Sequence, residues 1–213
     1  MSDYITAAIL NGIVNYGILF LICAFIEYCI YRYYKKKHIH VSQGFLIGYQ
    51  LLTLLIITIL SITGIGNIKD FFVSLGDKGF GTLFLEFNKD GLQHYDGRMN
   101  VLMFIPFGMF LPMVFSSARK WYYTWICGSV LSLLIEISQT FNYRTSDIND
   151  LFSNSIGTFI GYFIFLVFLR KIHIFLLEDQ GKLSKCHHYI QILILFLMFF
   201  LIGSPLISLL NSF

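Results

Sequence analysis

Long apolar runs constrain this chain more than any other feature, because each is about as long as a helix that crosses a bilayer. Such a helix takes about 20 predominantly apolar residues. The runs are continuous rather than alternating in polarity, which favours helices over the strands of a membrane barrel. They cover residues 7–31, 44–62, 99–115, 121–140 and 189–210, and one more begins near Ile148.

The composition agrees with a protein that lives in a membrane. The mean hydropathy is +0.71, and only 13% of the residues are charged, against about 25% in soluble domains. We therefore predict an all-α fold, a polytopic helical membrane protein with about six transmembrane helices. The 213 residues are assigned to a single integral membrane domain.

The distribution of basic residues predicts how the spans are oriented. Basic residues follow the first apolar run instead of preceding it, so we interpret that run as a retained span and not as a cleaved signal peptide. Lysine and arginine are enriched in cytoplasmic loops, and the larger basic group in this topology is Arg32, Lys35, Lys36, Lys37, Arg119, Lys120, Arg170, Lys171, Lys182 and Lys185. The smaller group on the other side is Lys69, Lys78, Lys89, Arg98 and Arg144. Both termini are then predicted outside.

Polar residues interrupt the apolar runs mainly at one junction between the third, fourth and fifth spans. They recur at spacings of three and four on the fourth span and again on the fifth, so each span has one polar side. Turning either side toward lipid would be costly, and the two polar sides should therefore face each other. The predicted polar cluster consists of Asn100, Glu136, Gln139, Arg144, Asp147, Asp150 and Asn154.

Prolines and glycines shape the helices around this junction. Pro106 and Pro112 predict a kinked third span, because proline removes a backbone hydrogen bond and bends a helix. Gly108 lies between these prolines, and Gly157 and Gly161 on the fifth span have the GxxxG spacing that allows helices to pack closely.

The longest polar region, residues 63–97, connects the second and third spans. Its apolar pieces at residues 68–75 and 82–87 are too short to cross a bilayer, so they predict short helices at the membrane surface. This region is either a connector on the lipid head groups or a lid over the polar junction.

Several of these segments together resemble the VanZ-like membrane protein family. The resemblance rests on the string NVLMFIPFGMFLP, on the pair Glu136 and Gln139, on Arg144, and on the string DINDLFSNSIGTFIGY. It covers about residues 45–170 and leaves an extra N-terminal span at 7–31 and an extra C-terminal span at 189–210.

The resemblance implies a bacterial protein of the cytoplasmic membrane, in a family associated with low-level resistance to teicoplanin-type glycopeptides. It supplies no catalytic mechanism. The polar positions of the family match the predicted polar cluster, and this implies that those residues act together.

The polar cluster allows several interpretations. Glu136, Arg144 and Asp150 could form a structural ion-pair network. Alternatively, an outward-facing pocket could bind or shield an envelope lipid or a lipid-anchored antibiotic, with Arg144 on an anionic head group. A membrane-embedded hydrolase or transferase, with Glu136 or Asp150 as general base, and an assembly scaffold are the alternatives.

The sequence predicts no cofactor and no metal, although Glu136, Asp147, Asp150 and Asn154 carry the oxygen ligands of a hard cation. HExxH and GxSxG patterns are absent. The cysteines lack metal or redox spacing; they are Cys23, Cys29, Cys127 and Cys186. The expected partners are the lipid bilayer and an envelope lipid or lipoglycopeptide, and no nucleic acid.

Overall fold

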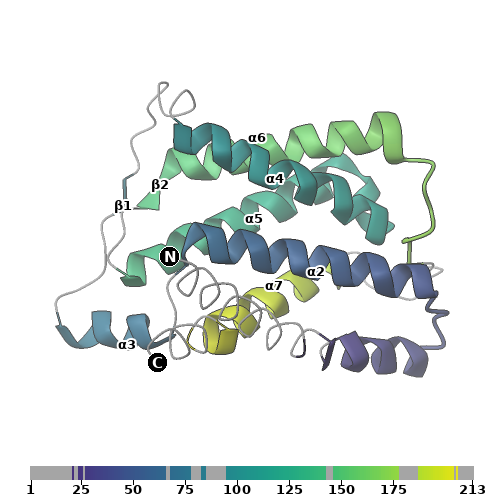
Figure 1. The fold of residues 1–213 in the computed structure, drawn as a ribbon, viewed down its shortest axis with the longest axis horizontal. Coiled ribbons are helices and arrows are strands. Elements are labelled where there is room, and N and C mark those ends of the chain that lie inside the picture. The colour runs from purple at the N-terminus through teal and green to yellow at the C-terminus, as the bar shows by residue number, and fades with distance from the viewer. Residues whose placement is uncertain are drawn as a thin grey trace, which may run out of the picture.

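The computed structural model describes residues 21, 24–25, 27–65, 68–77, 83–84, 95–142, 146–177, 187–203 and 205. Four helices pack together and alternate in direction along the chain (Figure 1): α2 (Gln43–Thr63), α4 (Tyr95–Val114), α5 (Trp121–Gln139) and α6 (Ile148–Ile164). Helix α7 (His187–Met198) packs against α2 and α5. A helix that includes residues 27–36 precedes α2, and α3 (Ile68–Asp77) follows it.

Short elements extend or join these helices. The 3-10 helices η2 (Ser117–Arg119) and η3 (Thr140–Asn142) flank α5, and the π-helices η4 (Phe165–Leu169) and η5 (Phe199–Gly203) extend α6 and α7. Two strands of two residues each, β1 (Leu83–Phe84) and β2 (Ser146–Asp147), pair in parallel. The described fold is otherwise helical. Helix α3 covers the first short helix predicted in the connector, but the helix predicted over 82–87 is wrong at residues 83–84, which form β1.

The described helices identify a helical membrane protein. Among the described residues, three segments are long and apolar enough to cross a membrane: Gln43–Gly76, which contains α2, Gly97–Val114 and Ile148–Leu169. Helix α5 has 19 residues, or about 28 Å, but it is not among these three segments. The apolar segment Tyr189–Ile202 is shorter, and most of the predicted first span lies outside the described residues. The number of six spans stays a prediction.

Glycines set the distance between α4 and α6. A methyl group at Gly161 would overlap the carbonyl oxygen of Ile105, and one at Gly108 would overlap the carbonyl oxygen of Thr158. Gly157 has the same relation to the carbonyl oxygen of Val101. The two backbones are therefore in direct contact, as small residues allow in membrane helices.

Helix α4 runs through its two prolines as one element. Pro106 and Pro112 both lie inside Tyr95–Val114. The kink that proline often causes stays a prediction.

One end of the bundle collects the basic residues. Here α2 begins and α4 and α6 end, and the described basic side chains at this end are Arg32, Lys35, Lys36, Lys37, Arg119, Lys120, Arg170 and Lys171. The opposite end, where α2 and α5 end and α4 and α6 begin, has Lys69 and Arg98 among the described residues. We call these the basic end and the polar end.

Arg119 holds the basic end together. Its guanidinium donates to the carbonyl of Ile172 over 3.1 Å and lies 3.0 Å from Nε2 of His173. Its backbone carbonyl accepts a 2.6 Å hydrogen bond from the Tyr162 hydroxyl. Burial, and then the charge of Arg170, lower the pKa of Arg119 from its ordinary value. These contacts join the α4–α5 turn to the end of α6.

Replacing Gly161 with alanine tests the contact between α4 and α6. The added methyl group must push the Ile105 carbonyl away, and overpacking costs about 1–3 kcal/mol. We expect a lower melting temperature for purified Gly161→Ala in detergent.

The matched control is Gly76→Ala in α3, because no atom lies within 4 Å of a methyl group there. Alanine favours a helix over glycine by about 1 kcal/mol, so Gly76→Ala should melt at or above the wild-type temperature. Equal melting temperatures for the two variants would contradict the proposed contact.

Candidate functional site

A pocket of about 260 Å³ lies at the polar end of the bundle. Four helices line it, two at their carboxyl ends and two at their amino ends. The lining residues are Ile62 and Thr63 of α2, Met99, Asn100 and Met103 of α4, Ile135, Glu136 and Gln139 of α5, and Asp150 and Asn154 of α6.

The structure brings most of the predicted polar cluster to this pocket. Its lining includes Asn100, Glu136, Gln139, Asp150 and Asn154. Asp147 is not in the lining, although it contacts Glu136. Arg144 lies outside the described residues, so the ion-pair network predicted around it is not described. That these residues bind a ligand stays a prediction.

Glu136 ties the end of α5 to the start of α6. Its side chain is only 4% exposed, and its Oε2 accepts the backbone N–H of Asp147 over 3.0 Å. A buried carboxylate needs such donors, because burial removes its water. Glu136 therefore has a structural role in addition to its position in the pocket.

Asp147 and Asp150 also have local structural roles. Asp147 is the N-cap of α6, and its Oδ1 accepts the backbone N–H of Asn149 over 2.9 Å and the Asn149 side-chain amide over 2.7 Å. A side-chain acceptor at this position satisfies a free amide of the first turn. Asp150 lies in that first turn, where a negative charge is favourable to the helix dipole.

The amide side chains connect three helices. Gln139 Nε2 donates to the carbonyl of Thr63 over 2.8 Å, which joins α5 to α2. Asn154 Nδ2 donates to the hydroxyl of Ser132 over 2.9 Å, which joins α6 to α5. Ser132 is not in the predicted cluster, although it lies one turn before Glu136 on the same helix. The acceptor on Thr63 is a backbone carbonyl, and a backbone group cannot be recognised from the pattern of side chains in the sequence.

Asn154 contains the least satisfied polar atom of the pocket. The residue is 1% exposed, and its Oδ1 has no hydrogen-bond partner in the described part of the chain. A buried acceptor without a partner costs about 1–3 kcal/mol.

Two lining residues of the pocket are exposed large apolar side chains, one on α2 and one on α4. Ile62 at the end of α2 is 69% exposed, and Met99 near the start of α4 is 45% exposed. Both side chains are apolar, whereas Glu136 and Asn154 lie on the buried side. The pocket thus has an apolar rim and a polar interior.

The connector between α2 and α4 contacts the α5–α6 turn beside this pocket. Phe84 in β1 is opposite Asp147 in β2. In α3, the Ser74 hydroxyl donates to the Phe141 carbonyl, and the Phe71 and Phe141 ring centroids are 5.1 Å apart. That the connector acts as a lid stays a prediction.

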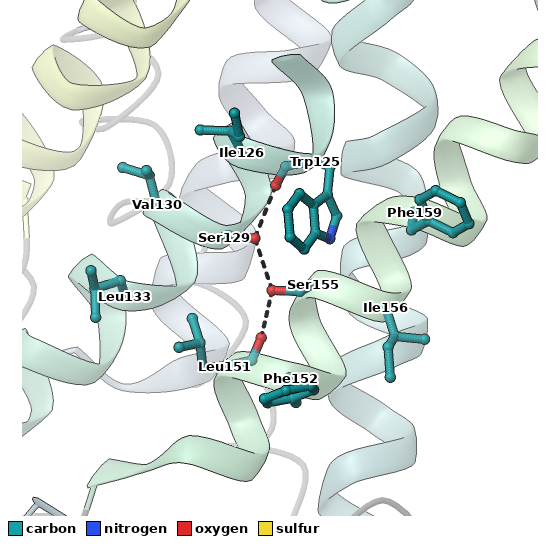
Figure 2. A pocket seen from close by; sticks show the side chains of 10 residues that line it. All are labelled: Trp125, Ile126, Ser129, Val130, Leu133, Leu151, Phe152, Ser155, Ile156 and Phe159. Carbon is teal, nitrogen blue, oxygen red and sulfur yellow. Dashed lines mark hydrogen bonds between the residues drawn. The ribbon is translucent and has the colours of Figure 1, made fainter. Parts of the chain in front are cut away.

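A second, apolar groove of about 520 Å³ lies between α5 and α6 (Figure 2). The hydroxyls of Ser129 and Ser155 lie 3.0 Å apart across it, and each also donates within its own helix, Ser129 to Trp125 and Ser155 to Leu151. The groove shares no lining residue with the polar pocket.

No described group of three or more His, Cys, Asp or Glu side chains could hold a metal ion. Two cysteines are described, Cys29 and Cys127, and both are free thiols.

Comparison with known proteins assigns the chain to a family. The sequence profile of the VanZ/LLP1 family matches residues 18–170. This chain belongs to the VanZ/LLP1 family. The match includes every lining residue of the polar pocket and confirms the VanZ-like resemblance. Comparison with curated proteins and with solved structures gave no match.

In this VanZ/LLP1 protein, replacing Glu136 with alanine tests its structural role. The change leaves the Asp147 N–H without its carboxylate acceptor, which costs about 1–3 kcal/mol. Glu136→Gln keeps a side-chain carbonyl and should lose less stability. Thermal melting of the purified variants in detergent measures the difference.

Leu133→Ala is the control on the same helix, because Leu133 is exposed and does not line the polar pocket. It should melt close to the wild-type temperature. If Glu136→Ala melts no lower than Leu133→Ala, the carboxylate does not stabilise the start of α6.

Proposed function

We propose that this VanZ-like protein binds the head group of a cell-envelope lipid, or a lipid-anchored glycopeptide of the teicoplanin class, in its polar pocket. Binding or shielding this ligand would change glycopeptide susceptibility. The observation that supports the proposal is the pocket itself, a polar interior behind the apolar rim of Ile62 and Met99. An amphiphile can place its head group inside and leave its tail in the lipid.

The charge distribution supports an outward-facing pocket in a bacterial cytoplasmic membrane. The basic end carries most of the described lysines and arginines, and cytoplasmic loops carry an excess of these residues. With the basic end in the cytoplasm, the pocket opens near the outer leaflet, where envelope lipids and glycopeptides are present.

Cysteine labelling tests this orientation. Exposed positions at the two ends are Lys69 in α3 and Ser116 after α4. In a background with the four native cysteines replaced by serine, a membrane-impermeant maleimide on intact cells should label Lys69→Cys and not Ser116→Cys. Permeabilised cells, in which both should react, provide the control, and the reverse pattern would place the pocket in the cytoplasm.

A susceptibility assay tests the function. Wild type, Glu136→Gln and Arg144→Ala are expressed in a susceptible Gram-positive host, and membrane abundance is measured beside teicoplanin susceptibility. We expect wild type to protect and both variants to lose protection at equal abundance, because each changes the charge of the predicted polar cluster.

Leu133→Ala is again the control and should protect like wild type, because its side chain lies outside the polar pocket. Full protection by abundant Glu136→Gln and Arg144→Ala would overturn the proposal. Turnover of a lipid-linked substrate that Glu136→Gln abolishes would instead identify a membrane-embedded hydrolase or transferase.

A further inference from the structure

We propose that the group held in the polar pocket is a hydrogen-bond donor, an ammonium or hydroxyl group of an amphiphile, and that Asn154 Oδ1 accepts one of its hydrogen bonds. This inference rests on the proposed function, because it specifies the chemistry of the ligand at the same site.

The first argument is the orientation of the Asn154 amide. Its Nδ2 donates to Ser132 over 2.9 Å, which directs the donor side of the amide toward α5. Asn154 is a lining residue of the pocket, and its carbonyl oxygen is buried without a partner in the described part of the chain. Because the residue is 1% exposed, we infer that the partner of this oxygen is a donor held inside the pocket and not bulk water.

The second argument is the balance of donors and acceptors around the pocket. One side-chain N–H of Gln139 donates to the Thr63 carbonyl, and one of Asn154 donates to Ser132. Asn100 adds an amide with both donors and an acceptor. Glu136 and Asp150 contribute carboxylates, which accept hydrogen bonds when ionised. None of the described lining residues is lysine, arginine or histidine. This lining suits a donor-rich group better than a bare phosphate.

The third argument is size. The volume of about 260 Å³ is slightly below that of a pocket for a drug-sized molecule, about 300–1,000 Å³. It is sufficient for a small head group but not for a whole lipid. The apolar chain of the ligand would leave between Ile62 and Met99, whose exposed side chains form the rim.

The test uses the full chain, purified and placed in nanodiscs, with three dioleoyl probes. Phosphatidylethanolamine carries an ammonium donor, and phosphatidylcholine has the same phosphate and positive charge but no donor on nitrogen. A diglucosyl diacylglycerol carries hydroxyl donors and no phosphate. Retention of each lipid by wild type is compared with its retention by Asn154→Leu, Asn154→Asp and the control Ser155→Ala.

We expect wild type to prefer phosphatidylethanolamine, the glycolipid or both over phosphatidylcholine by about tenfold, the effect of one hydrogen bond to a charged partner. Asn154→Leu should remove this preference, whereas Asn154→Asp keeps an acceptor and should retain it. Ser155→Ala should behave like wild type, because Ser155 lies in the apolar groove and not in the polar pocket. The preferred probe identifies the donor as ammonium or hydroxyl.

Equal retention of all three lipids by wild type would overturn the donor proposal, and this comparison does not depend on any variant folding. If Glu136→Gln nevertheless weakens retention of all three, the pocket binds lipid and the proposed function survives. If neither Glu136→Gln nor Asn154→Leu changes retention of any probe while both remain folded, the donor proposal and lipid binding in this pocket both fail.

Discussion

The backbone contact between α4 and α6 sets the distance between these two helices, and with it the spacing of the residues that they bring to the polar end. Gly108, Gly157 and Gly161 place their α-carbons against carbonyl oxygens of the facing helix. In lipid, helices gain little from burying apolar side chains against each other, so close packing and polar contacts hold them together. Asn154 lies one turn before Gly157, and Asn100 directly precedes Val101, whose carbonyl faces Gly157, so this contact brings both amides to the same pocket. A larger residue at the glycines would separate these two amides as well as the helices.

Local structure largely explains why carboxylates are present in the predicted polar cluster. Asp147 caps α6, Asp150 lies in its first turn, and Glu136 accepts the amide that begins the helix. A membrane helix that starts at a polar turn needs such groups, because free backbone amides are costly away from water. The amide of Asn154 is different, because its carbonyl has no role in holding the described helices together. The argument for a ligand is therefore stronger for this amide than for the acids.

The periodic polar residues allowed much of the site to be predicted. Spacings of three and four placed Glu136 and Gln139 on one face of a helix, and the same rule placed Asn154 opposite them. The apolar runs likewise predicted the helices that form the bundle. The pairing of β1 with β2 could not be predicted, because two-residue strands leave no periodic pattern and their backbone contacts are long-range. Helix α5, which carries Glu136 and Gln139, has 19 residues and is not among the three described segments that are long and apolar enough to cross a membrane.

The position of the mouth limits which molecules can use the pocket. A soluble ligand would have to pass Ile62 and Met99. These are exposed apolar side chains near the ends of α2 and α4, in segments that are long enough to cross a membrane. In the proposed orientation, an amphiphile in the outer leaflet would meet the same rim without leaving the membrane, and only its head group would lose water. A hydrogen bond to an acceptor that has no partner in the described chain, such as Asn154 Oδ1, would compensate that group for the water it loses. The apolar rim and the unsatisfied carbonyl therefore favour the same kind of ligand.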